Sequence, residues 1–245
     1  MIRNVKDIAE LGFDYVELPL APVMKLSGGQ FDELLGELRK YRVPCECANV
    51  MFPGDIRLTG RDFSPEKVNA YLDSAAERAK KLGIEVVVFG SGGARRVPDG
   101  FPREAAFMQL AGMLKSASEK FEGITVAIEH LNEGETNIIN SLDEVHELMC
   151  GVNAPNVKML VDLYHFAFEN KELSEIKKYA GDVAHVHIAE PAGREYPHTG
   201  NLSYYKEVFG VLKEMGYDGR ISIEGRSEDF PTDAKNAMEL FAAVR

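Results

Sequence analysis

The sequence has few cysteines and no long apolar run. Its three cysteines, Cys45, Cys47 and Cys150, cannot form a fully paired disulfide framework, which indicates a reducing compartment. The first residues, MIRNVKDIAE, lack the apolar segment of a secretion signal. No stretch approaches the roughly 20 apolar residues of a membrane-spanning helix. We therefore expect a cytoplasmic protein that has no membrane partner.

Positive charge is also scarce. The formal net charge is −11 over 245 residues, and such an acidic surface repels phosphate backbones, so we expect no nucleic-acid partner. Hydrophobic residues make up 45% of the chain and charged residues 27%, a balance that is ordinary for a globular protein with a core.

Several motifs of catalysis and phosphate binding are missing. There is no Gly-x-Ser-x-Gly elbow and no Cys/His pair at a recognisable spacing, so nucleophilic hydrolysis has no support. The glycines of Gly90–Gly93 (GSGG) lack the spacing of a P-loop or a dinucleotide fingerprint. With Arg95 and Arg96 behind them, they could still hold a phosphate through backbone amides and guanidinium groups. The alternative interpretation is a flexible loop between a strand and a helix.

Short β-rich runs alternate with helical patterns along the whole chain, which is typical of a parallel sheet. Glycine follows several of the helical patterns and allows the chain to turn back into the next strand. The predicted strands are Phe13–Leu18, Val43–Val50, Glu85–Phe89, Ile124–Glu129, Val157–Val161, Val183–Ile188 and Arg220–Glu224.

The predicted helices set the fold class. Ser64–Leu82 is the clearest, because Ser64 can cap it and Gly83 follows its end. Lys206–Met215 and Ala234–Val244 are further examples, and the chain starts directly in a helix, Val5–Leu11. An eight-stranded barrel would thus lack its first strand. We predict an α/β fold of the (β/α)8 TIM-barrel type with the first β-strand missing, and residues 1–245 as a single domain.

Four consecutive predicted strands each carry one potential metal ligand near the carboxyl end. Because those ends converge on one mouth of a barrel, we expect the four side chains to meet. Charged groups are rarely buried without a partner, which argues against four unrelated strand-end residues. Three carboxylates and one imidazole suit one divalent cation, with Mn²⁺ preferred and Mg²⁺ or Co²⁺ as alternatives. The predicted ligands are Glu129, Asp162, His187 and Glu224.

Further polar residues follow these strand ends. Glu135 lies in the loop after Glu129, His165 lies three residues past Asp162, and Glu190 and Arg194 follow His187. His185 shares a strand face with His187 but lies one layer deeper, so we interpret it as a packed core residue.

The segments IEHLNEGETN, VDLYH, HVHIAEPAGR and ISIEG together resemble the xylose-isomerase-like TIM barrel superfamily. The similarity is greatest to its sugar isomerase and ketose 3-epimerase branch, the tagatose/psicose epimerase type, and it extends from residue 13 through the final predicted helix. The resemblance implies a metal-dependent enzyme that acts on a small carbohydrate. It matches the four predicted ligands to the metal ligands of the family.

The resemblance also implies roles for individual residues. Glu129 and Glu224 match the two carboxylates that exchange protons with the substrate carbon, and Glu135, His165 and Arg194 fall at or near substrate-binding positions. Two departures from the family pattern stand out. A histidine, His130, replaces the usual proline, and Arg194 comes one residue later after His187 than in the epimerases.

Four functions stay open. The first is a sugar isomerase or epimerase that works through an enediolate. The second is a lyase or dehydratase of a keto-sugar or keto-inositol on the same site. The third is metal-dependent phosphodiester cleavage, which the acidic balance and the six histidines disfavour. The fourth is an inactive or partner-dependent barrel subunit. Relatives commonly form dimers or tetramers, so a homo-oligomer is compatible with each.

Overall fold

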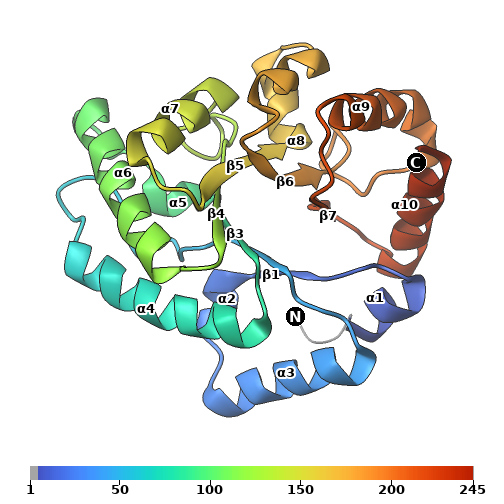
Figure 1. Cartoon of the computed structure of the whole chain (residues 1–245), viewed down its shortest axis with the longest axis horizontal. Coiled ribbons are helices and arrows are strands. Elements are labelled where there is room, and N and C mark those ends of the chain that lie inside the picture. Colours follow the sequence, from blue (N-terminus) through green and yellow to red (C-terminus); the bar gives the residue numbers. More distant parts are fainter. Residues whose placement is uncertain (1–4, 245) are drawn as a thin grey trace. The chain divides into compact units, whose positions relative to one another are not determined.

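The computed structural model describes residues 5–244, and the chain divides into two compact units, Met1–Lys158 (unit 1) and Met159–Arg245 (unit 2). Strands and helices alternate along the sequence in both units (Figure 1). The described residues contain seven strands, which confirms the TIM-barrel type of fold with one strand missing. Within these residues, every helix is too short or too polar to cross a membrane.

Unit 1 contains four parallel strands in the order β1-β2-β3-β4. Glu17 of β1 pairs with Cys47 of β2, and Phe89 of β3 pairs with Ile128 of β4. The strands are β1 (Glu17–Pro19), β2 (Cys47–Asn49), β3 (Val86–Phe89) and β4 (Thr125–Glu129). The helices are α1 (Val5–Leu11), α2 (Leu20–Met24), α3 (Gly28–Tyr41), α4 (Pro65–Leu82), α5 (Gly92–Arg95), α6 (Arg103–Lys120) and α7 (Leu142–Val152).

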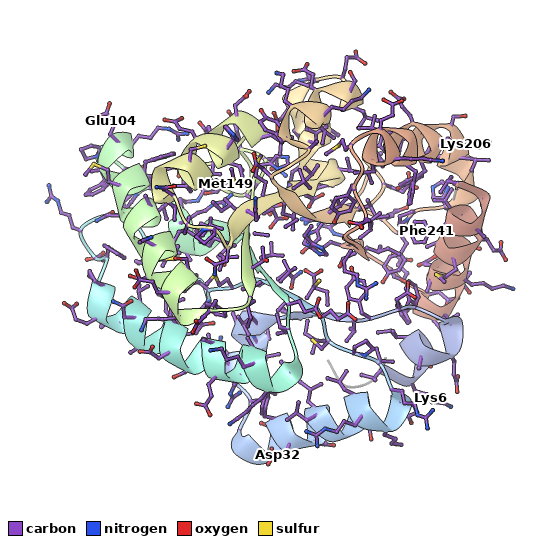
Figure 2. All side chains as sticks on the ribbon, in the orientation of Figure 1. Lys6, Asp32, Glu104, Met149, Lys206 and Phe241 are labelled. Atoms are coloured by element: carbon purple, nitrogen blue, oxygen red, sulfur yellow. The ribbon has the colours of Figure 1, made fainter. Side chains whose placement is uncertain are left out.

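The longer helices of unit 1 cover the strands from outside. Helix α4 packs against α6, and α6 packs against α7 (Figure 1). The exposed Asp32 on α3 and Glu104 on α6 project outward from these helices (Figure 2). The opposite faces are apolar at helical spacing, as in α4, whose buried residues are Val68, Leu72, Ala75, Ala76, Ala79 and Leu82.

The described part of unit 2 contains three parallel strands, in the order β5-β6-β7. Asp162 of β5 pairs with His187 of β6, and Ile188 of β6 pairs with Ile223 of β7. The strands are β5 (Val157–Asp162), which starts at the end of unit 1, β6 (Val183–Ile188) and β7 (Arg220–Ile223). The helices are α8 (Leu163–Phe166), η2 (Ala167–Glu169), η3 (Leu173–Tyr179), η4 (Thr199–Asn201), α9 (Leu202–Glu214) and α10 (Phe230–Val244). The rings of Phe209 on α9 and Phe241 on α10 lie 6.0 Å apart between their centroids; Phe241 is labelled in Figure 2.

The first two strands are shorter than predicted. The Val16 N–H donates to the Pro44 carbonyl at 2.9 Å, so the segments that precede β1 and β2 are already hydrogen-bonded to each other. Proline has no N–H to donate, which limits the ladder at Pro44. Val50, at φ 47°, bends the backbone just after β2. Cys45 and Cys47 are buried in this region, as expected, and burial raises the pKa of the Cys45 thiol to about 12.

Candidate metal centre and active site

The carboxyl ends of the three strands in unit 2 bring together two carboxylates and an imidazole. Asp162 is the last residue of β5, His187 lies opposite it in the ladder, and Glu224 directly follows β7. One ligand atom of each lies within 4.8 Å of the others, and His187 Nδ1 is 3.3 Å from Glu224 Oε2. Asp162 and His187 are buried, whereas the Glu224 side chain is 28% exposed.

This donor set fits a hard divalent cation. Carboxylate oxygens and an imidazole nitrogen are ligands that Mn²⁺ and Mg²⁺ accept, and three converging donors from rigid strand ends can share one ion. Unit 2 therefore contains a candidate metal-binding site formed by Asp162, His187 and Glu224.

Asp162 uses its two oxygens differently. Oδ1 accepts a hydrogen bond of 2.8 Å from the Tyr164 N–H and so caps α8. Oδ2 lies 3.5 Å from His165 Nε2 and 3.5 Å from an Arg194 guanidinium nitrogen. His165 is fully buried, and its ring lies edge-on to Tyr164 with 5.2 Å between the centroids. The structure thus brings two of the predicted substrate-binding residues next to a candidate ligand.

Arg194 connects Asp162 to Glu224. Its guanidinium donates to Glu224 Oε2 at 2.5 Å and lies over the Tyr164 ring, 4.9 Å from the centroid. Its main chain is left-handed, with φ 53°, and its carbonyl accepts from the Arg226 N–H at 2.6 Å. A Cβ on Gly225 would meet the Glu195 carbonyl oxygen at 2.7 Å, so a glycine is needed where this loop crosses the end of β7.

Glu190 anchors the same loop. It is buried, and its carboxylate accepts hydrogen bonds from the His198 N–H at 3.0 Å and from the Asn201 amide. Burial raises the pKa of Tyr204 to about 12, and the carboxylates of Glu190 and Asp162 add to the shift. Tyr204 therefore stays a neutral hydrogen-bonding group beside these carboxylates at neutral pH.

In unit 1, Glu129 is the buried last residue of β4. Its side chain fills the space that a side chain on Gly90 would need, since a Cβ there would lie 1.8 Å from Glu129 Oε2. Its carbonyl accepts a hydrogen bond of 2.8 Å from Arg95.

Glu135 is exposed in the turn after β4. Its N–H donates to the Asn132 carbonyl at 3.0 Å.

A sequence model described as xylose isomerase-like TIM barrel matches residues 5–244. The chain belongs to this family. An L-ribulose 3-epimerase from Methylomonas sp. (strain DH-1) is 28% identical over 93% of this chain and 79% of its own length. A putative hydroxypyruvate isomerase from Streptomyces coelicolor is 29% identical over 68% of this chain, and the match spans 62% of that protein.

Several solved structures have the same fold. The structure of D-allulose 3-epimerase from Methylomonas sp. in complex with D-allulose has a TM-score of 0.85, at 22% identity, and the match covers 100% of this chain and 91% of that one. A 3-keto-D-glucoside 4-epimerase from E. coli has a TM-score of 0.80, at 21% identity, and the match covers 100% of this chain and 93% of that one. The resemblance to sugar isomerases and ketose 3-epimerases is confirmed.

The Arg95 part of the phosphate-binding alternative is wrong. Arg95 cannot hold a phosphate from solvent, because it is fully buried and donates to backbone carbonyls. The GSGG segment is not simply a flexible loop either, because Gly92–Arg95 forms the short helix α5. His185 is confirmed as a packed core residue: it is buried, and its Nε2 is 3.1 Å from Ser222 Oγ.

Sequence reasoning missed Gly90, Gly225 and Tyr164. Gly90 directly follows β3 and Gly225 lies two residues past β7, and a glycine at a strand end is a recognisable signal for close backbone approach. Tyr164 gave no such signal, because its role depends on Arg194, which is 30 positions further along the chain.

Proposed function

We propose that this chain is a divalent-metal-dependent isomerase or epimerase that acts on a ketose or a related keto-polyol through an enediolate. The main support is the convergence of Asp162, His187 and Glu224 beside Arg194. Similar proteins that are named ketose, psicose and ribulose 3-epimerases support a carbohydrate substrate.

Asp162, His187 and Glu224 would hold the cation. We propose Glu129 as the fourth ligand, because it ends β4 as Asp162 ends β5 and because it matches the family pattern. The oxygen-rich set favours Mn²⁺. When bound, the cation supplies Lewis-acid stabilisation of negative charge on the substrate oxygens, worth several kcal/mol in the transition state.

Two carboxylates would move the proton. Glu224 is partly exposed, and Arg194 orients its Oε2, so Glu224 is proposed to remove the proton from the carbon beside the carbonyl. Glu129 is proposed to return a proton on the opposite face, which inverts that carbon. His165, Glu135 and Arg194 are proposed to bind the substrate oxygens.

The test follows hydrogen exchange at the substrate carbon. The wild-type protein with Mn²⁺ should incorporate solvent deuterium into a ketohexose in D₂O, as measured by NMR. Glu224→Gln should lower this exchange by about 10²-fold or more, since a positioned base contributes about 10²–10⁴-fold. Glu228→Gln, a change to an exposed carboxylate four residues on, should leave it unchanged. Unaltered exchange in Glu224→Gln would remove the proposed role of Glu224.

A lyase activity on the same residues is the second candidate. His130, an imidazole that directly follows Glu129, is fully buried and could protonate a leaving group. Product analysis on keto-sugars and keto-inositols separates the two: isomerisation conserves the elements of the substrate, whereas elimination releases water or an alcohol. Elimination as the main reaction would replace the epimerase proposal.

A further inference from the structure

Arg95 is an arginine with no solvent exposure, held at the ends of two strands of unit 1. One guanidinium nitrogen donates to the carbonyl of Phe89, the last residue of β3, at 3.3 Å, and to that of Glu129, the last residue of β4, at 2.8 Å. The other donates to the Ile139 carbonyl at 3.2 Å. These acceptors are peptide carbonyls from three separate segments, and the guanidinium fork is what allows one side chain to reach all of them.

Placing a guanidinium here is costly. Burial lowers the pKa of Arg95 to about 10, although the carboxylates of Glu129, Glu144 and Glu135 oppose the shift. The group still carries its charge at neutral pH, so its hydrogen bonds to the carbonyls are charge-assisted and stronger than neutral ones. An apolar side chain of similar length would fill the space without this desolvation cost. An arginine at this position is therefore best explained by its hydrogen bonds to the Phe89, Glu129 and Ile139 carbonyls.

The segment that Arg95 fixes also carries the Glu129 side chain. Gly90 lies one residue past β3, and the Glu129 carboxylate occupies the space above it. Ile139, the third acceptor, has a left-handed backbone with φ 60°, a conformation that is strained for a β-branched residue. Arg95 thus holds both ends of the loop 130–138, through the carbonyls of Glu129 and Ile139.

We propose that Arg95 is a positioning residue that fixes the end of β4, and with it the Glu129 carboxylate, for metal binding and proton transfer. The catalytic part of this inference depends on the function proposed above. The structural part, that Arg95 orders residues 125–141, stands independently of that function.

The test compares Arg95→Met and Arg95→Lys with Arg103→Met. Arg103 is a matched control because it also donates to a carbonyl of this loop, that of Asn137 at 2.5 Å, but it is exposed and pairs with Glu144. The readouts are the Mn²⁺ dissociation constant, kcat and KM measured separately, and amide hydrogen exchange of residues 125–141.

Arg95→Met should weaken Mn²⁺ binding by about tenfold or more, the usual effect of losing a group that orients a ligand. It should lower kcat at saturating Mn²⁺ and ketose far more than it raises KM. Arg95→Lys keeps the charge but cannot reach three carbonyls, so it should give an intermediate kcat and faster exchange. Arg103→Met should stay within about twofold of wild type, the usual scale for exposed ion pairs.

A folded Arg95→Met or Arg95→Lys with wild-type Mn²⁺ affinity, kcat and amide exchange would overturn the inference. If Arg95→Met does not fold, Arg95→Lys decides by the same three measurements. A wild-type protein that neither binds Mn²⁺ nor exchanges substrate hydrogen would refute the proposed function and the catalytic part of this inference. Faster amide exchange of residues 125–141 in Arg95→Lys than in Arg103→Met would still support the structural part, that Arg95 orders this segment.

Discussion

Individual residues in this chain are fixed by neighbours that are far away in the sequence. Gly90 and Glu129 lie 39 positions apart, yet the carboxylate of one occupies the space that a side chain of the other would fill. A strand-end carboxylate such as Asp162 could be predicted as a candidate ligand, because its place in the strand pattern is visible in the sequence. Gly90 at the end of a strand signals a close backbone approach, but that its neighbour is Glu129 could not be predicted, since the contact crosses two strands.

Gly90→Ala tests this contact. The added methyl group would collide with Glu129 Oε2, the mobile end of a side chain, so the carboxylate should move while the fold persists. A displacement of about 1 Å costs on the order of 10²-fold in rate, so we expect a loss of that size in kcat. The thermal midpoint, measured by circular dichroism, should change little.

Gly93→Ala is the control for this prediction. Gly93 lies three residues further on, and a Cβ there would meet no atom within 4 Å. The Gly93→Ala variant should therefore retain the wild-type kcat. Equal activities for the two variants would show that the Glu129 carboxylate does not need the space over Gly90.

At the scale of elements, local signals in the sequence set the long helices. Ser64 caps α4 as predicted, by accepting from the Lys67 N–H, and Gly83 ends it with φ 80°. The short helices α2, α5 and α8 were not predicted, because helices of four or five residues are too short to display a helical period. Strand ends were predicted to within a few residues, and the largest differences lie at β1 and β2, where Pro44 limits the ladder.

Two glycine substitutions should have opposite effects on stability. Gly83→Ala would place a Cβ on a left-handed residue and should lower the free energy of unfolding by about 1–2 kcal/mol. Gly36→Ala, in the exposed interior of α3, should raise it by about 0.5–1 kcal/mol. Urea unfolding of both variants measures the difference. A destabilised Gly36→Ala or a neutral Gly83→Ala would contradict the assigned backbone conformations.

Across residues 5–244, the order of strands and helices was predictable from the sequence, including the seven strands and the helix Val5–Leu11. Each element carries its own pattern of apolar residues and its own stop signal, so the repeat is visible without any tertiary contact. The loop contacts of Arg194, Tyr164 and Glu224 were not predictable, because they arise only when separate strands are placed side by side.

We propose that the two units form one domain, because the family match spans residues 5–244 and β5 passes from one unit into the other without a linker. Thermal unfolding should therefore follow one transition by both circular dichroism and calorimetry. At a Mn²⁺ concentration of about 100 times the dissociation constant, binding should add about 2.7 kcal/mol. The midpoint should then rise by roughly 5–10 °C, at about 2–4 °C per kcal/mol for a chain of this size.

His187→Ala provides the comparison for the manganese effect. This variant should lose most of the rise in midpoint, because one ligand is removed. Two separate transitions would contradict a single domain. A midpoint that does not respond to Mn²⁺ in the wild-type protein would contradict the proposed cofactor.

The double use of Asp162 bears on how this family should be compared across species. One oxygen of its carboxylate caps α8, a contact worth about 1 kcal/mol, while the other lies 3.5 Å from His165 Nε2 and 3.5 Å from an Arg194 guanidinium nitrogen. A descendant that had abandoned catalysis would still benefit from a capping side chain at this position. Asparagine would preserve that benefit and give up the negative charge. If Asp162 holds the proposed cation, a change from aspartate to asparagine in a relative should weaken cation binding, whereas a retained aspartate alone would not prove that a cation is bound.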